Sequence, residues 1–208
     1  MQQRAIITRQ NIVNAASQVF VEHGFAAANI ADVTSIAGIT KGAMYFHFKS
    51  KEDLARAVID EQQATYDALQ AEMLGKDLSA FDTMIEISYG ICALIKGNAL
   101  FYASMRIAVE LGVYGDPISK TYAEWGAPVA ALVAQAIDDG DIRSTVDPEA
   151  FASFVISAFT GIQTVSMVYS NLEDLDGRIM AMWDILLPGM VTDKKRLELA
   201  EQTPRAIS

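Results

Sequence analysis

Helix start and stop signals recur along the whole chain and constrain its fold more than any other feature. Ser, Thr, Asn or Asp residues precede stretches with helical apolar spacing, and Gly residues follow them. At Asp116-Pro117 and Asp147-Pro148, Pro occupies the first helical position, where its missing N–H costs no hydrogen bond. No stretch alternates apolar and polar residues as a half-buried strand does. The sequence therefore predicts an all-α fold.

The same signals divide the chain into a small N-terminal head and a larger body. The predicted helices span about residues 6–23, 30–37, 40–48, 50–73, 79–95, 99–111, 117–139, 148–170 and 174–190, with a short one from residue 193. The first three form a three-helix head, and the helix that starts at Ser50 joins it to the body without a flexible linker. We predict a head domain of residues 5–60 and a body domain of residues 61–202.

The charge of the chain is divided unevenly between these parts. Sixteen Lys and Arg against 26 Asp and Glu give a net charge of −10, which by itself argues against binding to nucleic acid. Residues 1–51, however, carry five basic and two acidic side chains, a net charge of +3, which leaves −13 for the other 157 residues. A basic head on an acidic body indicates that any contact with nucleic acid is made by the head.

The predicted helices at 30–37 and 40–48 form a helix-turn-helix pattern, with Gly38 in the tight turn between them. Gly42 and Ala43 leave almost no side chain at the N-terminal end of the second helix, so its backbone can approach a partner closely. The helix dipole and the N–H groups at this end suit a phosphate. Such a helix end is typical of proteins that read the DNA major groove.

Polar and basic side chains surround this helix end. Lys41 and Tyr45 are four residues apart and share one helical face. Lys49 and Lys51 add positive charge just after the helix, and His47, like Tyr45, adds a hydrogen-bond donor. We expect these groups to face the DNA backbone.

The other face of the same helix, with Met44, Phe46 and Phe48, is expected to pack onto the first two helices. Taken singly, each residue of this segment has an ordinary interpretation: lysines as solvated surface, aromatic rings as core, and His47 as a structural or surface residue. Taken together with the helix-turn-helix spacing and the local basic charge, they predict DNA binding.

The segment of residues 36–48, IAGITKGAMYFHF, with the KEDL that follows it, resembles the signature of TetR-type transcriptional repressors. The likeness extends back to Phe20, Gly24 and Phe25 and covers about residues 5–60. It implies an all-helical homodimer whose head binds a double-stranded DNA operator and whose C-terminal domain binds a small ligand and dimerises. The resemblance also assigns the DNA contacts, which are Thr40, Lys41, Gly42 and Ala43 at the groove and Tyr45, His47 and Lys51 at phosphates.

Within this family, three segments resemble the γ-butyrolactone receptors of actinobacteria. They are residues 40–59 in the head, residues 122–125 (YAEW) in the body, and residues 182–190 (MWDILLPGM) near the end. This resemblance implies an effector of the γ-butyrolactone type and places a pocket tryptophan at Trp125.

The composition of the body independently favours an apolar ligand pocket. The body is rich in Met, Phe, Tyr and Ala, and Trp125 can cover one wall of a cavity and offer its N–H to a ligand oxygen. Gln62, Thr160 and Gln163 are candidate polar anchors on neighbouring helices. The alternative is that all four are ordinary core or interface residues. Trp183 is expected in the core or at a dimer interface.

Residues 150–172 carry no charge over 23 positions, which is long enough to span a bilayer. Ser and Thr recur through this stretch at helical spacing, so we favour a core or interface helix over a membrane span. This helix and the one at 174–190 are too apolar for exposure on both sides, and pairing across a twofold axis would bury their outer faces. We therefore expect a homodimer and no membrane partner.

Patterns typical of enzymes, metal sites and secreted proteins are missing from the sequence. A single Cys, Cys92, and two His exclude an internal disulfide and most metal sites. The sequence contains neither the Gly-rich nucleotide-binding motifs nor the G-x-S-x-G of hydrolases. We predict no catalytic residue, cofactor or metal. The first ten residues lack the apolar core of a signal peptide, which favours a cytoplasmic location.

The sequence thus predicts a ligand-responsive transcriptional repressor. It would bind a palindromic operator as a homodimer and be released by a small, mostly apolar effector. A second function stays open at this point, that of an architectural or scaffolding protein that binds DNA with the same head and recruits a protein partner without an effector. Such a protein has no need for a cavity walled by Trp125.

Overall fold

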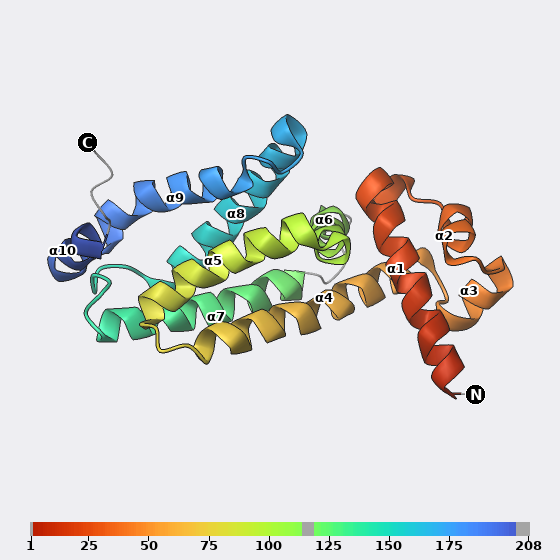
Figure 1. Ribbon diagram of the computed structural model, residues 1–208, viewed down its shortest axis with the longest axis horizontal. Helices are drawn as coiled ribbons and strands as arrows, with labels where there is room; N and C mark the ends of the chain where they lie inside the picture. Colours follow the sequence, from red (N-terminus) through yellow and green to blue (C-terminus); the bar gives the residue numbers. More distant parts are fainter. Residues whose placement is uncertain (1, 114–118, 203–208) are drawn as a thin grey trace. The chain divides into compact units, whose positions relative to one another are not determined.

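The fold is described from a computed structural model, which describes residues 2–113 and 119–202, apart from a few side chains within that range. The described residues form ten α-helices (Figure 1). Outside these helices, an isolated β-bridge pairs Ile142 with Val191. The prediction of an all-α fold is confirmed.

The helix bounds lie within two residues of the predicted ones, except for α1, which extends four residues beyond the predicted 6–23 at each end and continues past the break at Gly24. The predicted start at Asp116-Pro117 lies outside the described residues. The helices are α1 (Gln2–Ala27), α2 (Ile30–Ala37), α3 (Lys41–His47), α4 (Lys51–Leu74), α5 (Ala80–Gly97), α6 (Ala99–Val113), α7 (Ser119–Asp138), α8 (Pro148–Ser170), α9 (Leu175–Met190) and α10 (Asp193–Gln202).

Caps at the helix ends set the limits of the helix-turn-helix. Asn29 precedes α2, and its side chain accepts a hydrogen bond from the Ala31 N–H at 2.9 Å. α2 ends at Gly38, whose φ of 65° is one that glycine adopts without strain. Thr40 precedes α3 and accepts a hydrogen bond from the Ala43 N–H at 3.2 Å. The predicted helix-turn-helix is therefore confirmed.

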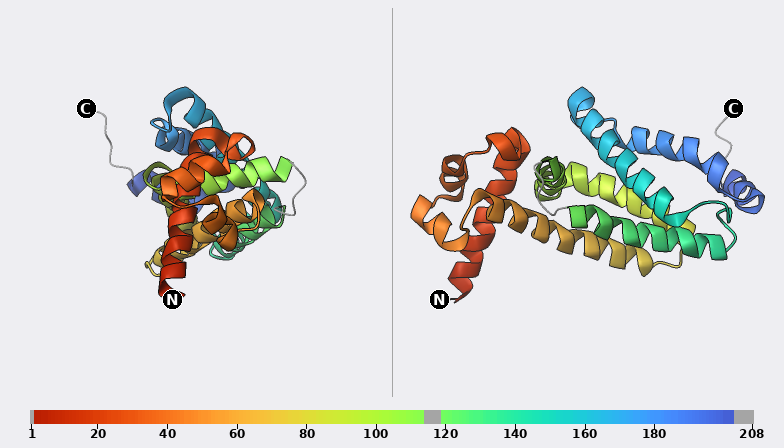
Figure 2. Two further views of the ribbon diagram at one scale, coloured as in Figure 1. Left: turned by 90° about the vertical axis from the view of Figure 1, so that its right-hand side faces the viewer. Right: turned by 180° about the vertical axis from the view of Figure 1, so that it is seen from behind.

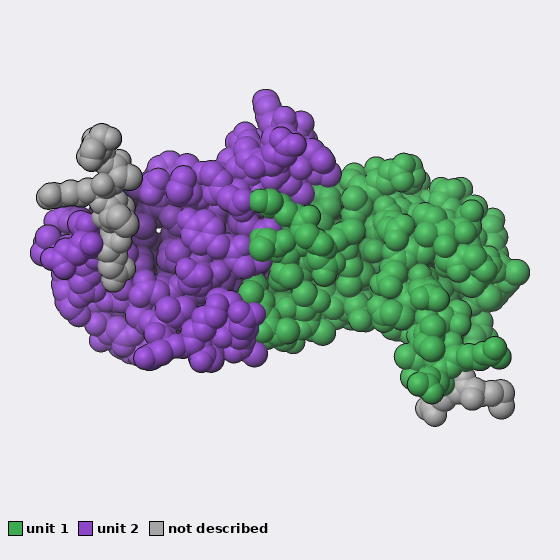
Figure 3. Space-filling model, in the orientation of Figure 1, with its two compact units in different colours: residues 1–70, 93–120 green, residues 71–92, 121–208 purple. Residues whose placement is uncertain are grey.

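The chain divides into two compact units, shown in different colours in Figure 3. Unit 1 comprises residues 1–70 and 93–120, and unit 2 comprises residues 71–92 and 121–208. Unit 1 is larger than the predicted head of residues 5–60, because α6 packs along α1. The division falls inside α4, α5 and α7, and the domain boundary expected at residue 60 stays a prediction.

The core of the head forms where α1, α2 and α3 pack together (Figure 2). Ile12 and Phe20 of α1 are fully buried, as is Met44 of α3, and Phe48 is nearly so. Phe46, in contrast, is 82% exposed, so the expectation that it packs onto the first two helices is wrong. Each residue turns a helix by about 100°, so a side chain two residues from the buried Met44 points away from the core.

In unit 2, α8 and α9 lie side by side (Figure 2), and a polar network holds their connection. The Asp174 carboxylate accepts hydrogen bonds from the Ser166 and Ser170 hydroxyls at 2.5 and 2.6 Å and pairs with Arg178 at 2.6 Å. The two serine hydrogen bonds and then Arg178 lower the pKa of Asp174 to about 2, because they favour the ionised carboxylate. Asn171 closes α8 with a φ of 51°.

Trp183 of α9 lies in the core of unit 2. It is 3% exposed, its Nε1–H donates a hydrogen bond to the Ser88 hydroxyl at 2.9 Å, and its ring lies 6.5 Å from that of Phe151. A buried indole N–H normally needs such a partner. The interpretation of Trp183 as a core residue is confirmed.

Among the described residues, α8 is long and apolar enough to cross a membrane by length and composition, and α5 with α6 would be a second candidate only if that bent pair formed one span. One face of α8, with Ala152, Val155 and Phe159, is buried within unit 2. The opposite face exposes apolar side chains such as Phe154 and Val168. α8 is therefore packed on one side, as expected of a core or interface helix.

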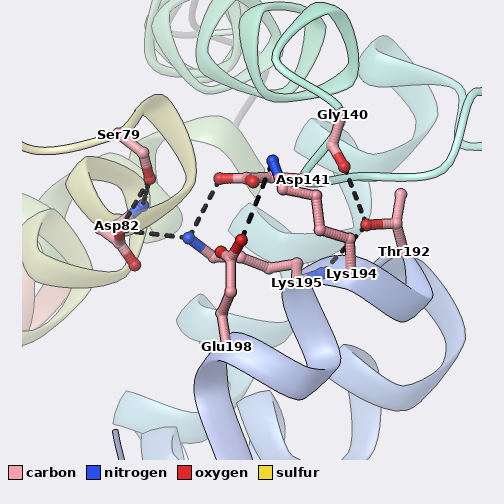
Figure 4. A network of polar contacts seen from close by, with 8 residues as sticks. All are labelled: Ser79, Asp82, Gly140, Asp141, Thr192, Lys194, Lys195 and Glu198. Atoms are coloured by element: carbon pink, nitrogen blue, oxygen red, sulfur yellow. Dashed lines mark hydrogen bonds and ion pairs between the residues drawn. The ribbon is translucent and has the colours of Figure 1, made fainter. Parts of the chain in front are cut away.

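A buried lysine fastens α10 to unit 2 (Figure 4). The Lys195 ammonium lies 3.2 Å from the Asp82 carboxylate at the start of α5 and 3.0 Å from Asp141, which follows α7. Burial disfavours the ammonium, but its hydrogen bonds to Asp141 and Asp82 and their charges outweigh burial and raise the pKa of Lys195. The Thr192 hydroxyl adds a hydrogen bond to the Gly140 carbonyl at 2.8 Å.

Lys195→Met should lower the free energy of unfolding by about 3 kcal/mol, because it leaves two neighbouring carboxylates without their cation. Urea titration followed by circular dichroism measures this change. The matched control is Lys194→Met, since Lys194 is an exposed neighbour that lies 3.8 Å from Glu198. Its loss should change the free energy of unfolding by less than about 0.5 kcal/mol. Equal effects of the two substitutions would contradict the role assigned to Lys195.

Candidate DNA-binding face and effector site

The predicted DNA contacts of α3 lie on the surface of unit 1. The exposed ones are Thr40, Lys41, Gly42 and Tyr45, and the half-buried ones are Ala43 and His47. A Cβ added at Gly42 would meet only the Thr40 hydroxyl, at 3.9 Å, so the backbone at this helix end is uncovered. Buried Met44 holds the opposite face of α3 in the core. The arrangement presents a small-residue helix end with a tyrosine one turn further on.

Lys51 has different neighbours from the other predicted contacts. Its ammonium donates hydrogen bonds to the backbone carbonyls of Phe25, Ala26 and Ala28 at 2.8, 3.1 and 3.2 Å. It also lies 4.7 Å from the centre of the Phe25 ring. An ammonium has three N–H donors, and all three are used inside the head. The phosphate contact that the resemblance assigns to Lys51 stays a prediction.

Phe46, which the sequence predicts to lie in the core, is a surface residue of α3. Its ring is 82% exposed and meets the His47 ring edge-on, with 5.3 Å between ring centres. An exposed aromatic ring can contact the methyl group of thymine in the major groove. The helical spacing could have indicated that Phe46 is exposed, because residues two apart, such as Met44 and Phe46, do not share one face of a helix.

Two glutamines predicted as effector anchors are buried with an unpaired oxygen. Gln62 on α4 belongs to unit 1 and Gln163 on α8 belongs to unit 2, and each is 3% exposed. Neither Oε1 atom has a hydrogen-bond partner among the described residues. Leaving such an atom unpaired costs about 1–3 kcal/mol, so a buried unpaired amide calls for a functional explanation. Tyr66, one turn after Gln62, is also buried, which raises its pKa to about 12.

The other two predicted anchors are less enclosed. Trp125 on α7 and Thr160 on α8 are half-buried. The Thr160 backbone carbonyl accepts a hydrogen bond from the Thr164 hydroxyl at 2.8 Å, within the same helix. Tyr122, which belongs to the same sequence segment as Trp125, lies outside the described side chains. The assignment of Trp125 and Thr160 to an effector pocket stays a prediction.

Unit 2 also contains an open groove of about 740 Å³ between α7 and α8. Small residues of α7 form one side of it, as the alanine-rich sequence of this helix suggests. The lining residues are Gly126, Ala127, Ala130, Ala131, Ala134, Pro148, Glu149, Ala152, Ser153, Ile156 and Ser157. None of the four predicted effector anchors is among them. No group of His, Cys, Asp or Glu within the described part of the chain is arranged to hold a metal ion.

Two protein-family models match the chain. Residues 12–58 match the model described as bacterial regulatory proteins of the tetR family. Residues 78–192 match the model described as a tetracyclin repressor-like C-terminal domain. The two models describe regulatory proteins, in agreement with a helix-turn-helix head followed by a helical body.

Individual relatives agree with these models over nearly the whole chain. The A-factor receptor protein of Streptomyces griseus is 31% identical over 209 residues, which cover 97% of this chain and 73% of the receptor. A crystal structure of a γ-butyrolactone receptor described as ArpA-like matches with a TM-score of 0.78 and 28% identity, over 93% of this chain and 92% of that one. The protein CprB of Streptomyces coelicolor, in complex with its biological operator sequence, matches with a TM-score of 0.76 and 28% identity, over 94% of both chains.

These matches confirm the resemblance that the motifs of the head and of the body indicate. One model alone covers more than half of the chain, and the relative from Streptomyces griseus extends the likeness across both units. The chain therefore belongs to the TetR family of bacterial transcriptional regulators.

Proposed function

We propose that the protein is a transcriptional repressor that binds a palindromic operator as a homodimer and is released by a small, mostly apolar effector of the γ-butyrolactone type. The observation that carries the proposal is the division of α3 into two faces. Met44 is buried, while Lys41, Gly42, Tyr45 and Phe46 are exposed together. A recognition helix needs such an arrangement, with one face fixed in the head and the other open to base edges and phosphates.

The two buried glutamine oxygens support response to an effector. An effector that donates a hydrogen bond to Gln62 or to Gln163 would remove the cost of leaving that oxygen unpaired. The scaffolding alternative offers no explanation for them. The γ-butyrolactone class is supported by the likeness to the A-factor receptor protein and to a γ-butyrolactone receptor.

Exposed apolar side chains on α8 and α9 support a homodimer. Four lie on α8 and two on α9, and the set is Phe154, Val165, Val168, Tyr169, Met180 and Ile185. Two copies related by a twofold axis would bury these side chains against each other and place two heads on two half-sites of one operator. An operator-binding function also implies that the protein works in the cytoplasm.

A gel-shift experiment with DNA from upstream of the protein's own gene tests the proposal, since such a repressor commonly controls itself. At fixed salt, the purified protein should retard one fragment, and a γ-butyrolactone should release it. If no lactone releases the DNA, the γ-butyrolactone class of effector is excluded, but the DNA-binding function is not. Failure to bind any specific duplex, including duplexes selected from a randomised pool, would overturn the proposal.

A further inference from the structure

The junction of α1 with α2, defined here as residues 24–28, includes the last residues of α1 and is held by side chains from two other helices. Regular helical geometry in α1 is broken at Gly24, which has a φ of 73° and a ψ of 170°. Beyond the junction, Asn29 caps α2, and α2 leads through Gly38 to α3. The orientation of α2 and α3 on α1 therefore depends on how this junction is fixed.

Two charged residues of α6 bind the backbone at the junction and just before it. The Glu110 carboxylate accepts hydrogen bonds from the Phe25 and Ala26 N–H groups at 2.7 and 3.2 Å. Arg106 pairs with Glu110 at 3.1 Å and donates to the Val21 backbone carbonyl at 2.7 Å. We name this pair, Arg106 and Glu110, the α6 clasp. It provides partners for backbone groups that the break at Gly24 leaves without intrahelical ones.

Gly24 is fitted to the clasp in two ways. Its positive φ is one that other residues adopt only with strain. In addition, a Cβ at this position would lie 2.7 Å from the Arg106 Nη2 atom and 2.7 Å from a Glu110 carboxylate oxygen. The absence of a side chain at Gly24 is therefore what lets the clasp approach the backbone.

Lys51 of α4 binds the same junction through its carbonyl groups. Its ammonium is bonded to the carbonyls of Phe25, Ala26 and Ala28, whereas Glu110 takes the N–H groups of the first two. A carboxylate on the donors and an ammonium on the acceptors fix the segment through both kinds of backbone group. The residues that position α2 and α3 thus include two that follow the head by more than 40 positions in the sequence.

We propose that Arg106 and Glu110 are positioning residues for DNA recognition. By fixing the junction, they set the orientation of α2 and α3. In this sense α6 contributes to DNA binding. The family model for the DNA-binding region ends at residue 58, and both residues fall within the range of the C-terminal model. The structure nevertheless assigns them to unit 1 with the head.

Glu110→Gln tests this role, because a positioning role and simple electrostatics predict opposite changes in the affinity for DNA. The substitution removes a negative charge, and electrostatics alone would strengthen binding to DNA. A positioning role predicts the opposite, a loss of affinity of about tenfold, because charge-assisted hydrogen bonds to the junction are weakened. The probe is a labelled duplex that the wild-type protein selects from a randomised pool, and the readout is fluorescence anisotropy over a range of salt concentrations.

The dependence on salt separates positioning from direct contact. Loss of a phosphate contact reduces the slope of log affinity against log salt by about 1, whereas loss of a positioning residue leaves the slope unchanged. The matched control is Glu22→Gln, which removes the same charge from an exposed residue of α1 whose carboxylate lies 3.9 Å from His23. Its affinity should equal that of the wild type or exceed it slightly.

Arg106→Lys and Arg106→Gln provide a second route if Glu110→Gln does not fold, as judged by circular dichroism at the assay temperature. The lysine variant keeps the charge and should lose less affinity than the glutamine variant. Weakened binding with an unchanged salt slope in the folded variants supports the proposal. Wild-type or tighter binding by folded Glu110→Gln would overturn it. Wild-type binding by folded Arg106→Gln, or a salt slope reduced by about 1 in that variant, would overturn it as well.

Discussion

Tyr45→Ala should remove specific operator binding and leave the rest of the protein folded. Tyr45 is 51% exposed on the open face of α3, while the neighbouring Met44 is buried and holds the helix in place. A hydrogen bond to a charged phosphate is worth about 1.5–3 kcal/mol, and the proposed dimer, with two heads, would lose it twice, about 3–6 kcal/mol in all. Anisotropy with the selected duplex measures the loss.

Two comparisons make this prediction specific. Tyr45→Phe keeps the ring and removes only the hydroxyl, so the difference between the two variants isolates the hydrogen bond from the contact of the ring. Circular dichroism and the oligomeric state in solution should match the wild type in both. Normal affinity of Tyr45→Ala would show that α3 does not face the DNA as assigned.

Trp125→Ala should bind the operator as the wild type does and fail to respond to the effector. Trp125 is a half-buried residue of α7, and a large aromatic ring at a pocket wall supplies much of the contact area of an apolar ligand. The expected result is a retarded DNA fragment that a γ-butyrolactone no longer releases. Operator binding should be unaffected, because Trp125 belongs to unit 2 and the candidate DNA-binding face belongs to unit 1.

The second tryptophan of the chain supplies the control. Trp183→Phe alters a buried core residue and its hydrogen bond to Ser88, so it should reduce stability and keep the response to effector. It also leaves Trp125 as the single tryptophan, whose fluorescence then reports ligand binding directly. Unchanged emission on addition of lactone, together with normal release by Trp125→Ala, would exclude Trp125 from the effector site.

Local features of the fold could be read from the sequence because local chemistry determines them. Asn29 and Thr40 cap helices through backbone groups two or three residues away, and Gly38 supplies a positive φ between them. These signals need no knowledge of distant contacts. The same holds for the Asp147-Pro148 start of α8, where the Asp147 carboxylate accepts from the Ala150 N–H at 2.8 Å.

Features that depend on contacts between distant segments could not be predicted in this way. Glu110 and Phe25 are 85 positions apart, and nothing in either local sequence indicates that one binds the backbone of the other. Lys51 looks like a surface cation in the sequence, and only the folded head brings three carbonyls to its ammonium. Gln163 lies in the charge-free stretch of residues 150–172, which favours its burial, whereas Gln62 follows Asp60 and Glu61 and its sequence neighbours give no such signal. The unpaired oxygens of both glutamines are a property of the packed structure.

The proposed mechanism requires that the effector weakens binding of the operator and that the operator weakens binding of the effector. Reciprocal binding measurements test this most directly. The affinity for the selected duplex is measured with and without a saturating γ-butyrolactone, and the affinity for the lactone is measured with and without saturating duplex, at one salt concentration. Linkage requires both affinities to fall by the same factor, about 5- to 150-fold for typical allosteric coupling. A lactone that binds without changing the affinity for DNA would contradict the claim.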